Sequence, residues 1–154
     1  GARVIVSEIN EERLKVAKEL GADVTVNPAK DDITRAVHSF VEDGVDVAIV
    51  TIGNKAAIES VFPLIARGAR IAIFASTHPS IKVEIDPNIL HYSEPFLTGS
   101  YDHMPENMYR ALQLMDSKRI DVTRIITHVL PLDKLAHGFN IVKSSNGLKV
   151  QISP

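Results

Sequence analysis

The sequence has no cysteine and no tryptophan, and aromatic residues make up only 5% of its 154 residues. The missing cysteines exclude disulfides, thiolate nucleophiles and zinc sites built on cysteine, and they favour a cytoplasmic protein. No apolar run approaches the roughly 18 residues of a membrane span, and the first residues lack the pattern of a signal peptide. Charges nearly balance, at 17 basic against 19 acidic residues, so neither nucleic acid nor a membrane is an expected partner.

Short aliphatic runs alternate with segments of helical period along the whole chain. Strands are expected at residues 4–6, 24–26, 45–50, 71–74, 96–100, 125–130 and 148–152. The early runs are nearly all valine, isoleucine and alanine, which indicates strands that are buried on both faces. Their alternation with helices predicts βαβ units, and therefore an α/β fold with a mainly parallel sheet and helices on both faces.

Polar caps, glycines and prolines mark the expected helices. Helix caps are expected at Asn10, Asp31-Asp32 and Asn54, and helix-ending glycines at Gly21, Gly44 and Gly68. The third helix should carry Ile58, Val61, Phe62 and Ile65 on one face, and Pro63 should kink or shorten it. The helix that begins near Pro105 should bury a stripe formed by Met108, Ala111, Leu112 and Met115.

Two features follow strands at the edge where a parallel sheet binds ligands. Glu8 follows the first expected strand, where a carboxylate can accept hydrogen bonds from the ribose diol of a dinucleotide. Its charge would repel a 2′-phosphate and favour NAD over NADP, although a solvated loop carboxylate is the competing interpretation. The turn Thr51-Ile52-Gly53 is either part of a ligand site or an ordinary turn whose glycine takes a positive φ.

The sequence contains no self-sufficient catalytic constellation. It has no G-x-S-x-G elbow, no P-loop and no G-x-G-x-x-G turn. No histidine shares a predicted helix face with another histidine or a carboxylate at metal-ligand spacing. All six are therefore interpreted as solvated or hydrogen-bonded residues: His38, His78, His91, His103, His128 and His137.

Several ordered segments of the chain resemble a known enzyme family. Residues 1–8, 12–14, 17–23, 45–53 and 66–71 are similar to the zinc-dependent medium-chain alcohol dehydrogenases. Residues 126–133 and 147–150 look most like the sorbitol (polyol) and threonine dehydrogenase branch. The resemblance covers essentially the whole chain, and it implies an NAD-binding Rossmann domain whose parent oxidises a secondary alcohol.

On the adenosine side, the resemblance implies binding roles for five residues. Glu8 would hold the adenosine ribose, and Arg13 would lie beside the adenine or the ribose. Ile52 and Gly53 would flank the adenine side of the cleft. Lys149 occupies a position where the family often has a basic residue near the pyrophosphate, although it could equally be a surface lysine.

On the nicotinamide side, the resemblance implies roles for five more residues. Ala75 and Ser76 would approach the nicotinamide. Ser100 and Asp102 would offer backbone groups to its carboxamide, with Tyr101 between them. Ala75 replaces the glycine usual in the family, and Asp102 replaces a basic or large side chain, so the cofactor and substrate geometry is expected to differ.

Parts of the family pattern are missing from this sequence. The first strand with its glycine-rich turn and the zinc-binding catalytic domain have no counterpart, so we expect a piece of a longer polypeptide that lacks the first βα unit. The missing strand lies in mid-sheet in the family's strand order, so its two neighbours would lose their shared partner. Alternatively, the two neighbouring strands would pair directly with each other, or another chain would fill the gap between them.

The sequence therefore predicts the cofactor-binding portion of an NAD-dependent, zinc-dependent alcohol or polyol dehydrogenase. Residues 1–124 would form a partial dinucleotide-binding domain, and residues 125–154 would return towards the absent catalytic domain. The chain alone should be inactive and bind NAD weakly, because the zinc ligands lie elsewhere. The parent would act on a small-molecule alcohol as a dimer or tetramer, paired around residues 96–101. The alternatives are a non-catalytic nucleotide-binding or protein-interaction module, and another α/β cofactor domain such as a hydrolase or methyltransferase.

Overall fold

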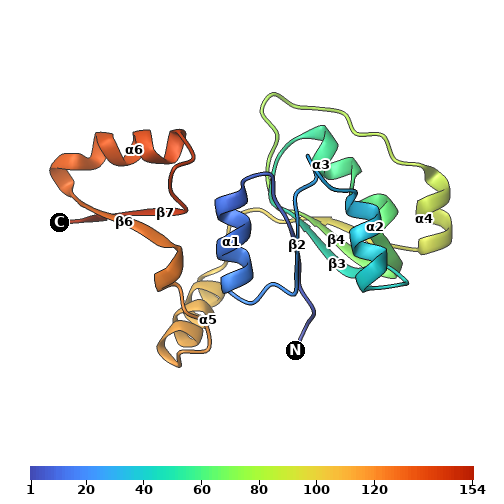
Figure 1. Cartoon of the computed structure of the whole chain (residues 1–154), viewed down its shortest axis with the longest axis horizontal. Coiled ribbons are helices and arrows are strands. Elements are labelled where there is room, and N and C mark those ends of the chain that lie inside the picture. The colour runs from blue at the N-terminus through green and yellow to red at the C-terminus, as the bar shows by residue number, and fades with distance from the viewer. The chain divides into compact units, whose positions relative to one another are not determined.

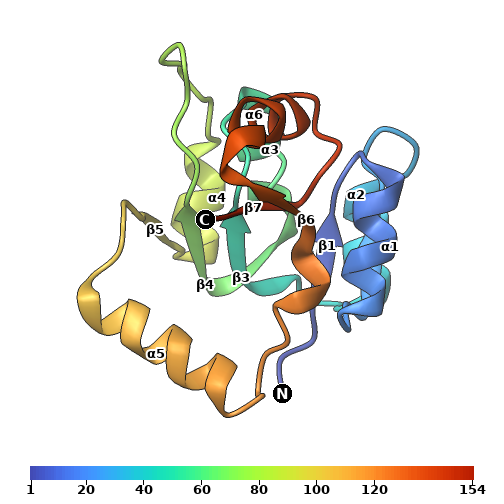
Figure 2. The same cartoon turned by 90° about the vertical axis from the view of Figure 1, so that its left-hand side faces the viewer.

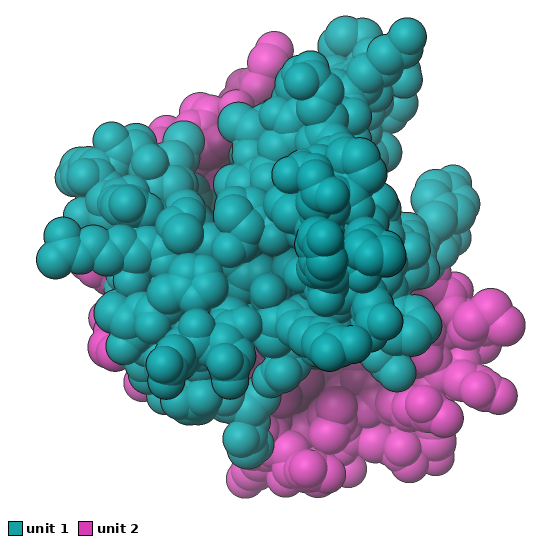
Figure 3. All heavy atoms as spheres, turned by 90° about the vertical axis from the view of Figure 1, so that its right-hand side faces the viewer, with its two compact units in different colours: residues 1–9, 22–102 teal, residues 10–21, 103–154 magenta.

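The computed structural model describes all 154 residues and divides into two compact units (Figures 1 and 3). Unit 1 comprises residues 1–9 and 22–102, and unit 2 comprises residues 10–21 and 103–154. The expected boundary between residues 124 and 125 falls inside unit 2 and stays a prediction. None of the helices combines the length and the apolar character that crossing a bilayer requires.

Strands and helices alternate along the entire chain. The strands are β1 (Ile5–Ser7), β2 (Val24–Val26), β3 (Val45–Val50), β4 (Ile65–Ile73), β5 (Phe96–Gly99), β6 (Ile126–Pro131) and β7 (Lys149–Ser153). The helices are α1 (Glu11–Glu19), α2 (Ile33–Phe40), α3 (Lys55–Glu59), α4 (Pro87–Ser93), α5 (Pro105–Asp116) and α6 (Leu135–Lys143). Three short 3₁₀ turns are η1 (Phe62–Leu64), η2 (Thr123–Ile125) and η3 (Leu132–Lys134).

All strand pairs are parallel, and they form three separate sheets. In unit 1, β1 pairs with β2, while β3, β4 and β5 form a sheet with β4 in the middle (Figure 2). In unit 2, β6 pairs with β7. Parallel strands joined through helices confirm the predicted α/β, Rossmann-like class.

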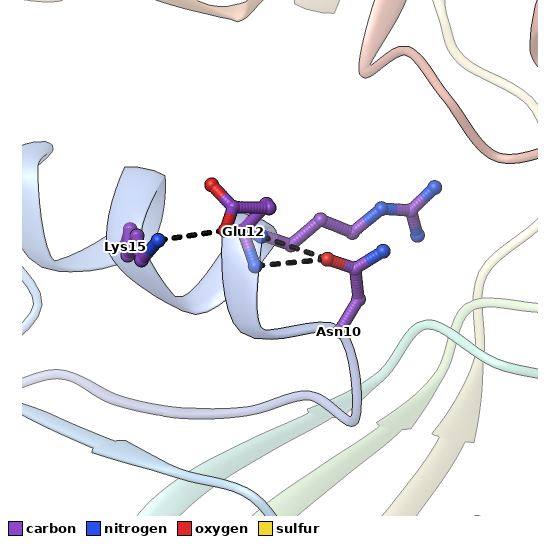
Figure 4. A network of polar contacts seen from close by, with 4 residues as sticks. Asn10, Glu12 and Lys15 are labelled. Carbon is purple, nitrogen blue, oxygen red and sulfur yellow. Dashed lines mark hydrogen bonds and ion pairs between the residues drawn. The ribbon is translucent and has the colours of Figure 1, made fainter.

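The predicted caps begin the first three helices. The Asn10 side chain accepts hydrogen bonds from the N–H groups of Glu12 and Arg13, at 3.0 and 3.2 Å (Figure 4). Asp32 and Asn54 cap α2 and α3 in the same way. These bonds satisfy N–H groups that have no partner inside the helix, which explains why the sequence located the helix starts correctly.

The third helix is short, which was one of the two outcomes expected from Pro63. It ends at Glu59, and Pro63 lies in the separate turn η1, where its missing N–H interrupts no α-helical ladder. Ile65, which was expected on the helix face, begins β4 instead. Gly68, which was expected to end the helix, lies inside β4 with a φ of 71°. The register between β3 and β4 shifts in this region, so the glycine serves a strand irregularity.

Two other helices also differ from expectation. Helix α4 is not among the helices expected from the sequence, and Asp86 caps it by accepting the N–H of Asn88 at 2.8 Å. Helix α5 begins at Pro105 as expected, yet none of its residues is buried. Met108 is 50% exposed and Leu112 is 55% exposed, so the expected buried stripe is wrong for this chain.

The core of unit 1 lies around β4 and α3. Its buried residues are Val50, Ile58, Phe62, Ile65, Ala69 and Ile71. Ile71 is fully buried and pairs with Ala48 on one side and with Leu97 on the other. The expectation that the early strands are buried on both faces is wrong for β3, where Val47 is 59% exposed and Ile49 is 64% exposed.

Candidate functional site

The ends of three parallel strands lie in one row across the sheet of unit 1. Val50 pairs with Ile73, and Ile73 pairs with Gly99. Hydrogen bonds extend this row: the Ala75 N–H donates to the Val50 carbonyl at 3.2 Å, and the Ser100 N–H donates to the Ile73 carbonyl at 3.0 Å. The loops that carry the predicted residues therefore leave the sheet side by side, at the carboxyl edge where open α/β sheets bind ligands.

Gly53 brings two of these loops into direct backbone contact. A Cβ added to Gly53 would overlap the Ser76 carbonyl oxygen and lie 2.9 Å from the Ser76 carbonyl carbon. The positive φ that was one interpretation of this glycine is absent, since among the glycines only Gly21, Gly44 and Gly68 take one. A close backbone approach, and not an unusual turn, is therefore what requires glycine at this position.

Glu8 follows β1 and is held in place through its neighbours. Its N–H donates to the Val26 carbonyl at 3.1 Å. Asn27 is only 5% exposed, and its Nδ2 donates to the Ile9 carbonyl at 3.1 Å while its Oδ1 accepts the N–H of Ala29 at 3.0 Å. Sequence reasoning missed this buried amide, whose one signal was an Asn-Pro pair typical of a turn. Asn27 therefore positions the loop that carries Glu8.

A groove of about 210 Å³ separates β1 from β3. Ser7 of β1 and Ile49 of β3 line it, together with Thr51 and Ile52 beyond the end of β3. Because β1 pairs only with β2 and β3 pairs only with β4, the alternative of direct pairing between β1 and β3 is wrong. The groove lies between β1 and β3, the two strands that were expected to lose a shared neighbour. It reaches the loop that follows β3.

Ser100, Tyr101 and Asp102 form an exposed turn beyond β5. Tyr101 is 98% exposed, and Asp102 has a φ of 56°, in the left-handed region. The Ser100 N–H is engaged by the Ile73 carbonyl, so its carbonyl oxygen is the backbone group that a ligand could use. This turn differs from the loops after β3 and β4, which touch one another.

Arg13 and Lys149 belong to unit 2. Arg13 lies in the first turn of α1. The same helix carries the Lys15–Glu12 ion pair of 2.6 Å (Figure 4). Together with residues 145–148 it lines a cavity of about 240 Å³. Within unit 2, the structure thus brings Arg13 to the loop that leads directly into Lys149 and β7.

The carboxyl edge of unit 1 fits the demands of a dinucleotide. The loops after β3, β4 and β5 leave the sheet side by side at this edge, and the half-buried Glu8 follows β1. Open parallel sheets bind dinucleotides at such an edge, and a carboxylate beyond a strand accepts hydrogen bonds from a ribose diol. Nowhere in the 154 residues do three His, Asp or Glu side chains gather around one point, as a metal ion would need.

Comparisons with known proteins match most of this chain. A family model of zinc-binding dehydrogenases matches residues 1–117. L-threonine 3-dehydrogenase of Yersinia pestis (strain Pestoides F) is 31% identical over 156 residues, which cover 99% of this chain and 45% of that protein.

Solved structures extend the comparison to the fold. A protein of Sinorhizobium meliloti 1021, described as a zinc-binding dehydrogenase and bound to NADP, is 26% identical with a TM-score of 0.89, covering 100% of this chain and 46% of that one. An alcohol dehydrogenase of Thermotoga maritima shares the fold at 23% identity and a TM-score of 0.92, covering 100% and 44%. The chain therefore spans less than half the length of the relatives it matches and corresponds to their cofactor-binding domain. With most of its length matched by the family model, the chain belongs to the zinc-binding dehydrogenase family.

Proposed function

We propose that this chain supplies the nicotinamide-dinucleotide site of an NAD-dependent, zinc-dependent alcohol or polyol dehydrogenase of the sorbitol and threonine dehydrogenase branch. The observation that carries the proposal is the row of strand ends in unit 1, closed by the contact between Gly53 and Ser76. At an edge of this kind, a dinucleotide can lie against the backbone of the loops that follow the strands. The bound dinucleotide would supply the hydride acceptor.

On the adenosine side, Glu8 would accept hydrogen bonds from the ribose diol, and Asn27 would keep the Glu8 loop in place. Ile52 is 54% exposed at the groove and would cover one face of the adenine, next to Gly53. Arg13 would add a positive charge near the ribose. The carboxylate of Glu8 would disfavour a 2′-phosphate, so NAD is proposed although the Sinorhizobium meliloti neighbour binds NADP.

On the nicotinamide side, Ala75 and Ser76 would border the ring, and the turn Ser100–Asp102 would meet the carboxamide. The Ser100 carbonyl would accept from the carboxamide N–H₂ group, because its own N–H is already engaged. Lys149 would balance the pyrophosphate charge. These residues bind and orient the cofactor, and none of them would perform proton transfer.

Zinc and the general base of the whole enzyme would come from outside these 154 residues. We therefore propose that the isolated chain turns over no alcohol and binds NAD weakly. A non-catalytic interaction module is the second candidate, favoured by the open groove between β1 and β3. The two candidates differ in whether Glu8 contacts a ribose.

The test is an NADH and NADPH titration of the chain, followed by the fluorescence of the reduced nicotinamide. Glu8→Ala should weaken NADH binding about tenfold, since it removes a charge-assisted acceptor. The same change should reduce the difference in affinity between NADH and NADPH. Glu106→Ala, at an exposed carboxylate of α5, is the matched control. Equal NADH affinity in Glu8→Ala and the unaltered chain would favour the interaction module.

We also propose that the whole protein is a cytoplasmic dimer or tetramer that pairs through β5. This strand is the edge of its sheet, all four of its residues are exposed, and Phe96 is 67% exposed. An uncovered edge strand can template pairing with a second chain. Phe96→Glu should therefore lower the mass of the whole protein in analytical ultracentrifugation.

A further inference from the structure

Residues 75–86, which make up nearly all of the segment between β4 and α4, cross unit 1 without regular secondary structure, and we name them the strap. Its second half alternates like a strand, although it belongs to no sheet. Ile81, Val83 and Ile85 are partly buried and pack against the core, whereas Lys82 and Glu84 point to solvent. Apolar packing therefore seats the strap, without a backbone ladder to fix its position along the surface.

Two residues of α3 hold the strap through its exposed face. The Glu84 N–H donates to Glu59 Oε1 at 2.7 Å, and Lys55 Nζ lies 2.8 Å from Glu84 Oε1. Lys55 Nζ also lies 3.5 Å from Glu59 Oε1, one helical turn away. Glu59 thus binds both the strap backbone and the lysine that binds the strap side chain. We name this three-residue cluster the clasp.

The charges of the clasp match its geometry. A hydrogen bond from Lys55 and its positive charge lower the pKa of the Glu84 carboxyl. The pKa of Lys55 is raised, first by the hydrogen bond to Glu84 and then by the charge of Glu59. The side chain of Glu59 is 29% exposed, the least of the three. Glu59 is therefore the most shielded side chain of the clasp.

The other end of the strap begins at the proposed nicotinamide edge. Ala75 donates its N–H to the Val50 carbonyl, and the Ser76 backbone touches Gly53, two residues before Lys55. We propose that Lys55 and Glu59 are positioning residues, which fasten the strap to α3 and thereby hold Ala75 and Ser76 against the β3 loop. The effect of these residues on the cofactor site rests on the proposed function, whereas their attachment of the strap to α3 does not.

The experiment measures amide exchange by NMR in the ¹⁵N-labelled chain and in Glu59→Ala, Glu59→Gln and Arg67→Ala. Glu59→Ala should accelerate exchange at the Glu84 amide about three- to tenfold, as expected for losing one hydrogen bond. Exchange at the Ala75 amide should accelerate as well, whereas exchange at the Ser100 amide, which lies outside the strap, should not. Glu59→Gln should have a smaller effect, because glutamine still offers an oxygen to the Glu84 N–H.

Arg67→Ala is the matched control, since it removes an exposed ion pair to Glu94 that does not touch the strap. It should leave the exchange of both strap amides unchanged. An unchanged Ala75 amide in Glu59→Ala, beside a faster Glu84 amide, would overturn the positioning role. Glu59→Gln keeps this test valid if Glu59→Ala does not fold.

A parallel NADH titration separates this inference from the proposed function. Glu59→Ala should weaken NADH binding severalfold, and an unchanged affinity would overturn the link between the clasp and the cofactor edge. Failure of the unaltered chain to bind NADH would count against the proposed function, while the Ala75 amide would still decide whether the clasp holds the strap.

Discussion

Strands β3 and β4 have similar aliphatic sequences and very different surroundings. Ile71 of β4 has a neighbouring strand on each side and is fully buried. Ile49 of β3 has a neighbour on one side only, lines the groove on the other, and is 64% exposed. An apolar run indicates a strand whose side chains can pack against other elements. The strand is buried only where those elements are present.

The same contrast separates the two units. Unit 1 contains the buried cluster around β4, whereas in unit 2 few side chains are buried, among them Leu14 and Ile141. Phe139 and Val129 of unit 2 are 68% and 61% exposed. Unit 1 therefore has the larger buried core, and it is the unit that presents the carboxyl edge.

The largest expected effect comes from truncating the two isoleucines in turn. Ile71→Ala should destabilise the chain by about 3–4 kcal/mol, because it leaves a cavity in a packed core. Ile49→Ala should cost less than about 1 kcal/mol, because that side chain is largely in water already. Urea denaturation followed by circular dichroism measures both. Equal losses of stability in the two variants would contradict the contrast drawn between β3 and β4.

The next effect concerns the contact between the loops after these strands. Gly53→Ala must displace the Ser76 backbone, at a cost of about 1–3 kcal/mol for overpacking. The displacement should also weaken NADH binding at least about tenfold, because the edge itself moves. Gly99→Ala is the matched control for stability, since a Cβ there meets nothing within 4 Å. Thermal unfolding of both variants and NADH titration of Gly53→Ala check this prediction, which fails if the two variants unfold at the same temperature.

Local signals predicted the parts of the fold that depend on local chemistry. Asn10, Asp32 and Asn54 cap helices as expected, because a cap is decided by a side chain and the next few N–H groups. Ile65 was assigned to a helix because its spacing continued that of α3, but pairing with β3 places it in a strand. Pairing depends on residues far along the chain, which periodicity does not report.

The candidate site was predictable in the same uneven way. The sequence singled out Gly53, and the structure supplies the reason, because the clash with Ser76 appears only when two loops from different strands meet. Asn27 was missed because its importance lies in burial and in a bond to the Ile9 carbonyl, both of which require the folded chain. The cofactor-binding roles of all the predicted site residues, including Arg13 and Lys149, stay predictions.

The smallest expected effect is a pH dependence of the clasp. The folded-state pKa of Glu84 lies below the ordinary value of 4.5, so its contribution is complete above that pH and is lost as the pH falls through the folded value. The unaltered chain should therefore exceed Glu84→Gln in Tm at pH 6, and the difference should shrink below pH 4.5. A difference that persists at pH 3 would contradict the ion pair with Lys55.

The most direct test of the proposed site is an NMR titration of the ¹⁵N-labelled chain with millimolar NAD. We expect amide shifts concentrated at the strand ends of unit 1, at Gly53, Ser76 and Ser100 and around Glu8, with the Arg67 amide unchanged. No shifts at these positions, or shifts confined to residues away from the carboxyl edge, would contradict the claim that this edge binds a nicotinamide dinucleotide.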